Sequence, residues 1–285
     1  MPLAEMPQNF SNPAKSIVHL TDFSPSAEMA FAHALRIALM NKARLTLMHV
    51  GEDASDDWDR FPSLRETLQR WGILSEGARR SDVRQLGIEI DKVLVEGRNV
   101  AGALAGYYRK HSIDMLVLAA SQRSRWTEWL RPEAVGDVAQ KLCIPTLFVP
   151  ASGRGCVSLE DGHVSLNQVL VPVDHKPAPG DAVERGLRAL NAFGNENSQL
   201  TLLYIGSESE FPHVPIPEGP WKVVRTVRSG HAGSEILATA NELDADLIVM
   251  VTSGNEGILD VLRGSTTDQV LRNAGCPVLS IPEDD

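Results

Sequence analysis

The sequence predicts an α/β protein made of two tandem, doubly wound parallel sheets of five strands each, related by a pseudo-twofold axis. Two observations carry this prediction. Short aliphatic runs alternate with segments of helical periodicity, a pattern typical of parallel strands joined by right-handed helical crossovers. The same order of segments also occurs twice in the 285 residues, a length that favours two domains over one.

Four matched pairs of segments define the repeat. They are SIVHLTDFSPSAE with QVLVPVDHKPAPG, ARLTLMHVGED with SQLTLLYIGSE, SIDMLVLAAS with DADLIVMVTS, and CIPTLFVP with GCPVLSIP. Because all four keep their order, chance is a poor explanation. We expect one domain over 1–150 and a second over 168–285, joined by a polar, aperiodic linker over 151–167.

The first repeat carries the clearer elements. Strands are expected at 17–20, 45–50, 88–95, 115–119 and 146–149, and helices after Asp22, within 61–87, over about 100–110 and over about 134–142. The first helix shows apolar residues at i, i+3, i+4 and i+7 spacing. The first and fourth strands are apolar without alternation, which indicates burial on both faces of a parallel sheet. In the second repeat, prolines leave no room for a helix between Gly206 and Trp221.

Composition excludes several classes of protein. Hydrophobic residues make up 43% of the chain, enough for a buried core, and the net charge of −10 is unsuited to nucleic-acid binding. Three cysteines do not make a disulfide scaffold and fit a reducing compartment. The N-terminus lacks the apolar region of a signal peptide, and no apolar run is long enough to cross a membrane. We therefore expect a cytoplasmic protein without nucleic-acid or membrane partners.

Motifs for catalysis and metal binding are absent from the sequence. There is no G-x-S-x-G, H-E-x-x-H, C-x-x-C or P-loop motif, so no catalytic residue and no metal ligand is assigned. His19 and His49 are expected on neighbouring strands as a half-buried pair. The sequence favours a binding protein over an enzyme and leaves enzymatic activity open.

A glycine-containing loop follows the fourth strand of the second repeat. Gly254 and Gly264 let the backbone approach a ligand closely, and Ser265, Thr266 and Thr267 open a helix whose free N–H groups favour an anion. Phosphate binding is one interpretation. The other is that a hydroxyl merely caps the helix and Gly254 forms a turn.

Together, IVHLTDFSPSAE, LTLMHV, VLVPVD and DADLIVMVTSGNEGILDVLRGSTTDQVLRNAGCPVLSIP resemble the universal stress protein family. The resemblance extends over nearly the whole chain, as a tandem two-domain member. It implies a Rossmann-like fold of the adenine nucleotide alpha hydrolase-like type.

The resemblance also implies a nucleotide site in the second domain. Nucleotide-binding members carry Gly-x2-Gly-x9-Gly-Ser/Thr, which Gly254, Gly264 and Ser265 match, whereas Val251 stands at the first glycine and would crowd the ribose or phosphate. The adenine-contacting aspartate corresponds to Asp174. The full set of implied site residues is Pro172, Val173, Asp174, Ile205, Met250, Ser253, Gly254, Gly264, Ser265, Thr266 and Thr267.

In the first domain the same comparison implies a degenerate site. Asp22 is kept, but Ala119, Gln122 and Pro132 replace the glycines and Glu133 replaces the hydroxyl residue. Proline removes an N–H donor and a carboxylate repels phosphate, so we expect the first domain to have lost the phosphate loop.

What the resemblance implies for function is a stress-response protein that acts through binding. Its ligand would be ATP or AMP, with Mg²⁺ an option beside ATP. Two alternatives stay open: a weak ATP hydrolase, and a protein that binds no nucleotide and acts on a protein partner that the sequence does not identify.

The fifth strand of each repeat is predicted at a sheet edge, and unpaired edges invite pairing. We expect 146–149 and 278–281 to pair antiparallel within the chain as a pseudo-dimer. Pro150 and Pro282 would end these strands, because proline cannot donate to a ladder. A further homodimer through another face is left open.

Overall fold

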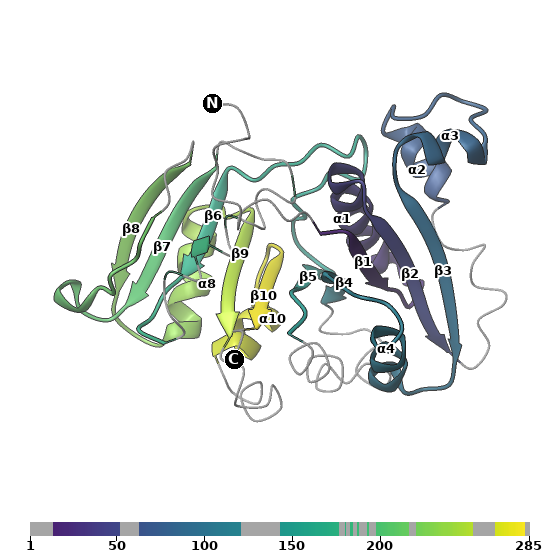
Figure 1. The fold of residues 1–285 in the computed structure, drawn as a ribbon. Helices are drawn as coiled ribbons and strands as arrows, with labels where there is room; N and C mark the ends of the chain where they lie inside the picture. The colour runs from purple at the N-terminus through teal and green to yellow at the C-terminus, as the bar shows by residue number, and fades with distance from the viewer. Residues whose placement is uncertain are drawn as a thin grey trace.

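The computed structural model describes residues 14–51, 63–120, 143–176, 198–216, 221–252 and 266–282, together with positions 180, 183, 184, 187 and 193. Its strands form one ten-stranded sheet in the order β3-β2-β1-β4-β5-β10-β9-β6-β7-β8. Residues 14–120 lie on one side of the molecule and residues 198–252 on the other, with β5 and β10 between them (Figure 1). The predicted α/β fold is confirmed.

Each half of the sheet contributes five parallel strands. The strands of the first half are β1 (Ser16–Leu20), β2 (Arg44–Gly51), β3 (Glu89–Glu96), β4 (Met115–Ala120) and β5 (Thr146–Pro150). Those of the second half are β6 (Gln168–Pro172), β7 (Gln199–Ile205), β8 (Lys222–Arg228), β9 (Leu247–Thr252) and β10 (Val278–Pro282). The predicted strands of the first repeat agree with these bounds to within one residue.

The described helices are α1 (Pro25–Asn41), α2 (Leu64–Arg70), α3 (Arg80–Gln85), α4 (Val100–Tyr108), α8 (Ala232–Glu242) and α10 (Thr266–Asn273), with the 3-10 turn η4 (Glu208–Glu210). The helix predicted at 134–142 lies outside the described residues. The helix predicted within 61–87 is wrong as a single helix, because it is split into α2 and α3. Gly72 and Gly77 lie between them with φ of +68° and +79°, a left-handed backbone that interrupts a helix.

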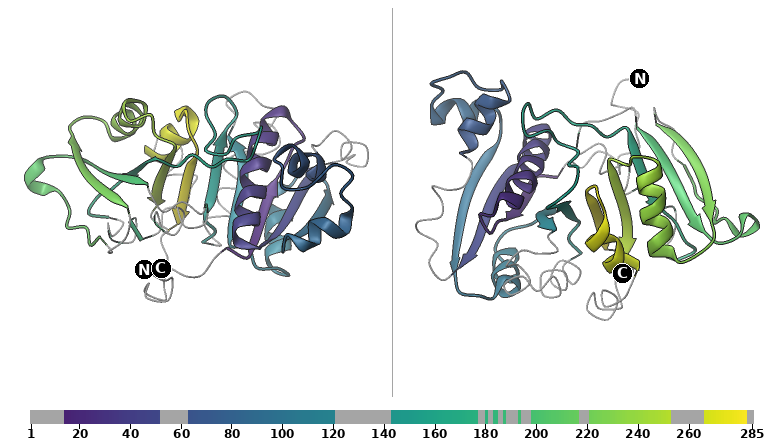
Figure 2. Two further views of the ribbon diagram at one scale, coloured as in Figure 1. Left: turned by 90° about the horizontal axis from the view of Figure 1, so that it is seen from above. Right: turned by 180° about the vertical axis from the view of Figure 1, so that it is seen from behind.

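The hydrophobic core lies on both faces of the sheet. On the face that α1 covers, one cluster extends through both halves, from Ile17 of β1 to Leu279 of β10. On the opposite face, α4 covers a cluster in the first half, and α8 and α10 cover another in the second. Figure 2 shows α8 and α10 side by side in both of its views. Strands β1 and β4 are buried on both faces, as their unbroken apolar runs predicted.

The two halves meet where β5 and β10 pair antiparallel. Leu147 lies opposite Leu279, and Thr146 lies opposite Ser280. This pairing confirms the predicted association of the two strand-five edges within the chain. Both strands end at the expected prolines, Pro150 and Pro282.

In each half, an aspartate carboxylate accepts hydrogen bonds from the backbone at the start of the first strand. The Asp114 carboxylate accepts the backbone N–H groups of Lys15 and Ser16 at 2.7 and 2.9 Å. Asp246 does the same for Asn167 and Gln168, at 2.7 and 3.0 Å. The repeat found in the sequence is therefore a repeat of hydrogen bonding as well.

The linker, residues 151–167, packs against both halves. Its Arg154 forms an ion pair with Asp244 at 2.6 Å and donates its backbone N–H to Gly275 O at 2.8 Å, both in the second half. Cys156 and Val157 are buried in the core cluster that both halves share. The prediction that the linker is polar and aperiodic holds for its sequence, but these contacts make it a packed part of the fold.

Two side chains of the first half hold the rest of the linker. The Trp71 Nε1–H donates to Leu159 O at 3.1 Å, and the backbone N–H of Cys156 donates to His33 Nε2 at 3.0 Å. Since Nε2 of His33 is the acceptor, its proton lies on Nδ1, which donates to Met29 O at 2.7 Å. This arrangement requires a neutral imidazole.

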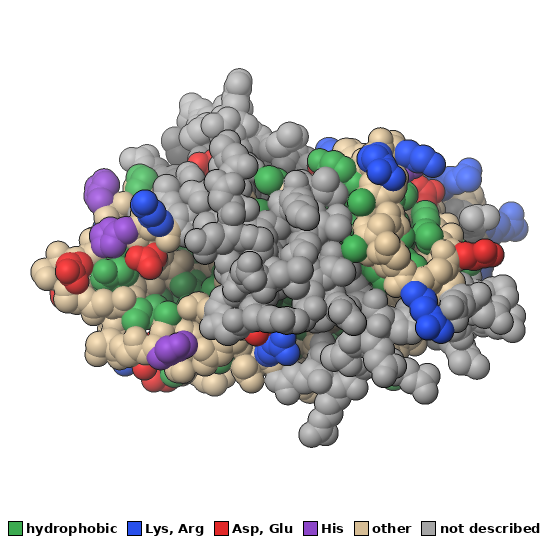
Figure 3. All heavy atoms as spheres, turned by 90° about the horizontal axis from the view of Figure 1, so that it is seen from below, with side chains coloured by type: hydrophobic (Ala, Val, Ile, Leu, Met, Phe, Trp, Pro, Cys, Tyr) green, Lys and Arg blue, Asp and Glu red, His purple; other side chains and the backbone are tan. Residues whose placement is uncertain are grey.

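Basic side chains gather toward one end of the face drawn in Figure 3. Figure 3 shows one face, on which Lys and Arg side chains gather toward the end formed by residues 14–120. Histidine side chains lie toward the other end.

We predict that Gly162→Ala destabilises the protein by roughly 2–4 kcal/mol. A Cβ at Gly162 would lie 2.5 Å from Trp71 Cδ2, and φ is +69°. The matched control is Gly72→Ala, where φ is +68° and no heavy atom lies within 4 Å, so only backbone strain of about 1–2 kcal/mol is expected. Denaturant unfolding measures both; equal losses would show that the linker does not press on Trp71.

We also predict that His33 makes stability depend on pH. Burial lowers the pKa of His33 to about 4 from the ordinary 6.5. The unfolded chain therefore binds the proton first, and this contribution to stability is lost as the pH falls below 6.5. Between pH 6.5 and 5 the loss is about 2 kcal/mol.

His33→Gln is the matched variant, because an amide can donate and accept in similar places but does not titrate in this range. Between pH 6.5 and 5, its free energy of unfolding should decrease by about 2 kcal/mol less than that of the wild type. His19, whose pKa burial also lowers to about 4, remains in both proteins and cancels. Parallel curves would contradict the prediction.

Candidate functional site

In each half the strand order reverses beside the first strand. β6 lies between β7 and β9, and β1 lies between β2 and β4. The chain leaves β6 toward one edge and returns to β9 on the other side, so the crossovers diverge at the carboxyl ends of β6 and β9. In open α/β sheets this switch point is where ligands bind. The sequence placed its candidate residues at these ends.

Asp174 lies at the second switch point, two residues after β6. Its carboxylate is exposed, and one oxygen accepts the backbone N–H of His175 at 2.7 Å. The preceding Val173 is buried and donates its N–H to Leu203 O at 2.8 Å. Pro172, the last residue of β6, has no N–H to donate. The strand thus fixes the backbone that presents Asp174.

Aromatic rings lie beside this carboxylate. The rings of His175 and Tyr204 meet edge to face at 5.7 Å, and Tyr204 meets Phe211 at 5.8 Å. Desolvation raises the pKa of the Tyr204 phenol, with smaller contributions from the negative charges of Glu210 and Asp174. The site therefore combines the exposed carboxylates of Asp174 and Glu210 with aromatic surfaces.

The ends of β7 and β9 supply the neighbouring residues. Ile205 ends β7 and is half-buried, while Met250 in β9 is buried in the cluster beneath α8 and α10. Val251 pairs with Ile281 of β10, and its side chain packs against the shared core.

Beyond β9 the candidate loop is only partly described. Thr266 and Thr267 form the first turn of α10. Ser253, Gly254, Gly264 and Ser265 lie outside the described residues, so their predicted roles stay predictions.

The first half repeats this geometry with different side chains. Thr21 donates its N–H to Met48 O at 3.0 Å, as Val173 does in the second half, and the Asp22 carboxylate accepts the N–H of Ser24 at 2.9 Å. Phe23 adopts a φ of +58°, and its ring lies 4.4 Å from that of His49. Ala119 is buried within β4. Gln122, Pro132 and Glu133 lie outside the described residues.

His19 and His49 lie on the neighbouring strands β1 and β2, as expected. The register places His19 opposite Leu47, and each imidazole contacts a different carbonyl: His19 Nδ1 lies 3.1 Å from Val117 O, and His49 Nδ1 lies 2.7 Å from Thr21 O. Both rings are buried rather than half-buried. A two-residue offset across the ladder separates them.

Three residues at the second switch point were not predicted from the sequence. His175 and Tyr204 come together because His175 follows β6 and Tyr204 is the last but one residue of the neighbouring strand β7, and only the register shows it. Thr252, the last residue of β9, has a buried hydroxyl without a hydrogen-bond partner among the described residues. Its position directly before the glycine loop is the signal that could have identified it.

The family model for universal stress proteins matches residues 13–150 and 217–282, more than half of the chain. The chain belongs to the universal stress protein family. Among curated relatives, universal stress protein MJ0531 of Methanocaldococcus jannaschii is 24% identical over 150 residues, which cover 43% of this chain and 86% of the relative.

Solved structures of similar fold cover nearly the whole chain. A universal stress protein from Archaeoglobus fulgidus has a TM-score of 0.60 at 16% identity and covers 95% of this chain and 97% of its own. Protein PA1789 of Pseudomonas aeruginosa, described as functionally unknown, has a TM-score of 0.60 at 14% identity, with coverages of 98% and 95%. At these identities the likeness shows the fold alone.

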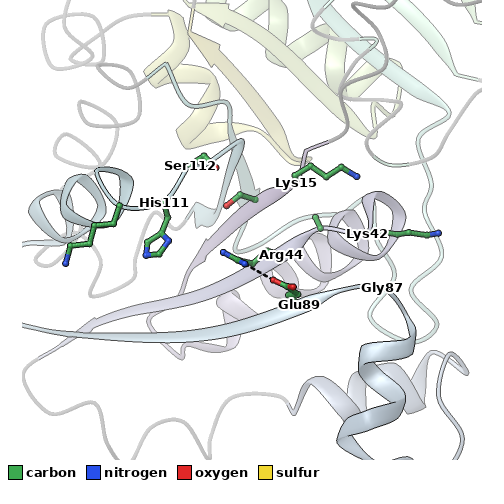
Figure 4. A pocket seen from close by; sticks show the side chains of 10 residues that line it. Lys15, Lys42, Arg44, Gly87, Glu89, His111 and Ser112 are labelled. Carbon is green, nitrogen blue, oxygen red and sulfur yellow. Dashed lines mark hydrogen bonds and ion pairs between the residues drawn. The ribbon is translucent and has the colours of Figure 1, made fainter.

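A pocket of about 480 Å³ lies at the opposite edge of the first half, where β1, β2 and β3 begin. Figure 4 shows Arg44 facing Glu89, while Lys15 and Lys42 point away from them. Arg44 is paired with Glu89 at 2.8 Å and Asp91 at 3.5 Å, and the Lys15 ammonium donates to Asn41 O. The lining also holds Lys42 and Lys110, and the Asn41 carbonyl carries no charge, so cationic side chains outnumber the single lining carboxylate, Glu89.

No group of three or more His, Cys, Asp or Glu side chains in the described ranges could hold a metal ion. No described helix is long and apolar enough to cross a bilayer.

Proposed function

We propose that this universal stress protein binds ATP or AMP at the switch point between β6 and β9, and that it acts through binding rather than strong catalysis. The observation that carries the proposal is Asp174, an exposed carboxylate held at the carboxyl end of β6 where the strand order reverses. An aspartate there can accept hydrogen bonds from a purine amine or a ribose hydroxyl.

The surroundings of Asp174 support an adenine nucleotide. His175 and Tyr204 offer aromatic surface next to the carboxylate, and aromatic faces stack readily on bases. Thr252, whose hydroxyl is buried, stands two residues before Gly254 in the sequence, at the start of the segment with the glycine motif. These features match the ends of a nucleotide, with the base near β6 and phosphates near the loop.

The chain's part in holding Mg²⁺ would be small. The described residues provide no carboxylate cluster at the site, and Mg²⁺ commonly takes its ligands from phosphates and water with one or two carboxylates. If ATP binds with Mg²⁺, the phosphates would therefore carry most of its coordination.

The first prediction for this site concerns stoichiometry. Isothermal titration with ATP or AMP should give about one site per chain, because only the second half keeps the glycine motif. Asp174→Ala and Gly264→Val should each abolish binding, through loss of the base contact and through crowding of the phosphate approach.

Asp22→Ala is the matched control and should leave affinity unchanged, with folding of all variants checked by thermal unfolding. Two equivalent sites would contradict the loss inferred for the first half. No binding by the wild type would favour a protein that acts only on a protein partner. Steady release of ADP from ATP, abolished with Asp174→Ala, would favour the weak hydrolase.

The second prediction concerns Val251. Val251→Gly should strengthen nucleotide affinity, since the family keeps a bare backbone there. It should also lower stability by about 1–3 kcal/mol, because the side chain packs against the shared core and glycine weakens a strand. Titration and denaturant unfolding of the same variant separate the two effects; unchanged affinity would show that the nucleotide site accommodates valine.

A further inference from the structure

Two buried threonines lie on β7 and α8, which contact each other. Thr201 of β7 is 1% exposed and Thr239 of α8 is 2% exposed. Neither hydroxyl has a hydrogen-bond partner in the part of the chain that the structure describes. Thr201 points to the same side of the sheet as Leu203, which packs in one cluster with Ile236 of α8.

The first half of the molecule shows what these positions do there. Thr46 pairs with Val18 of β1 as Thr201 pairs with Leu170 of β6. Tyr107 lies seven residues before Asp114, and Thr239 lies seven residues before Asp246, the equivalent aspartate of the second half. The equivalent of the threonine pair is therefore Thr46 with Tyr107.

In that first half the two groups are bonded. The Thr46 and Tyr107 hydroxyl oxygens lie 2.9 Å apart, so the phenol of α4 reaches the strand and satisfies its hydroxyl. Threonine at position 239 is much shorter than tyrosine and cannot reach as far. The second half thus has a hydroxyl at both positions but lacks the long tyrosine side chain that brings the two hydroxyls together in the first half.

Leaving a hydroxyl buried without a partner is costly, since it forfeits its hydrogen bonds to water. Buried water molecules commonly resolve this by bonding to two or more such groups. We propose that an internal water molecule bridges Thr201 and Thr239, where the Tyr107 phenol acts in the first half. Water can donate to one hydroxyl and accept from the other.

The apolar surroundings favour a small uncharged molecule at this position. The buried cluster at this interface consists of apolar side chains such as Ile236, Ala240 and Leu203. An ion would lie there without an opposite charge, which is strongly unfavourable. A single water needs only the two hydroxyls and adjoining backbone groups.

Threonine-to-valine changes test the proposal, because valine keeps the shape and removes only the hydroxyl. With a bridging water, Thr201→Val and Thr239→Val should each lower the ratio of folded to unfolded protein by roughly 5- to 30-fold. The double variant should cost little more than either single variant, since the water then leaves with both partners.

Without a bridging water the outcome reverses. Removing an unsatisfied hydroxyl would leave stability equal or raised, and the two changes would add. That result would overturn the proposal. Thr46→Val is the control in the first half, where the Tyr107 hydroxyl loses a direct partner and stability must fall.

A crystal structure of the full chain at high resolution gives an independent reading. Density for one water within hydrogen-bond distance of both Thr201 and Thr239 is expected, and its absence would refute the bridge. In Thr239→Tyr the phenol should bond to Thr201 directly and the water density should disappear, while a water that persists unchanged would show that it does not depend on this pair.

Discussion

The antiparallel pairing of β5 with β10 is the constraint on which the rest of the architecture depends. It places two edge strands at the centre of a continuous sheet, with Leu147 opposite Leu279. The core on the α1 face then runs without interruption from one half to the other. An exposed edge is a route to association with other chains, and this joint removes two such edges at once. The remaining edges, β3 and β8, carry charged residues along their length.

The linker makes that joint part of a larger packed unit. Arg154 is held by the turn before β9, and Cys156 by His33 of α1. A flexible tether would need only length, whereas this segment excludes a side chain at Gly162 because Trp71 lies against it. The relative placement of the two halves is therefore supported both by the strand ladder and by the chain that connects them.

Much of this could be read from the sequence because it depends on period and repetition. The unbroken apolar runs of β1 and β4 and the proline-ended fifth strands gave correct expectations, and Asp22 and Asp174 both lie two residues after the first strand of their half. What could not be read depends on register and on three-dimensional neighbours. His19 and His49 lie on adjacent strands yet two residues out of register, and Tyr204 meets His175 only because β7 lies next to β6. The packing of the linker had no sequence period to reveal it.

The two halves have diverged where the architecture permits. Both halves retain the fifth strand, β5 or β10, and the aspartate, Asp114 or Asp246. The shared sheet depends on the strands, and the start of each first strand depends on the aspartates. In sequence, the segments that follow β4 and β9 differ, with Pro132 and Glu133 in the first repeat and Gly264 and Ser265 in the second. Neither segment contributes a residue to the β5–β10 ladder. A duplicated fold joined through its edge strands can therefore keep its joint while segments outside the joint differ in sequence.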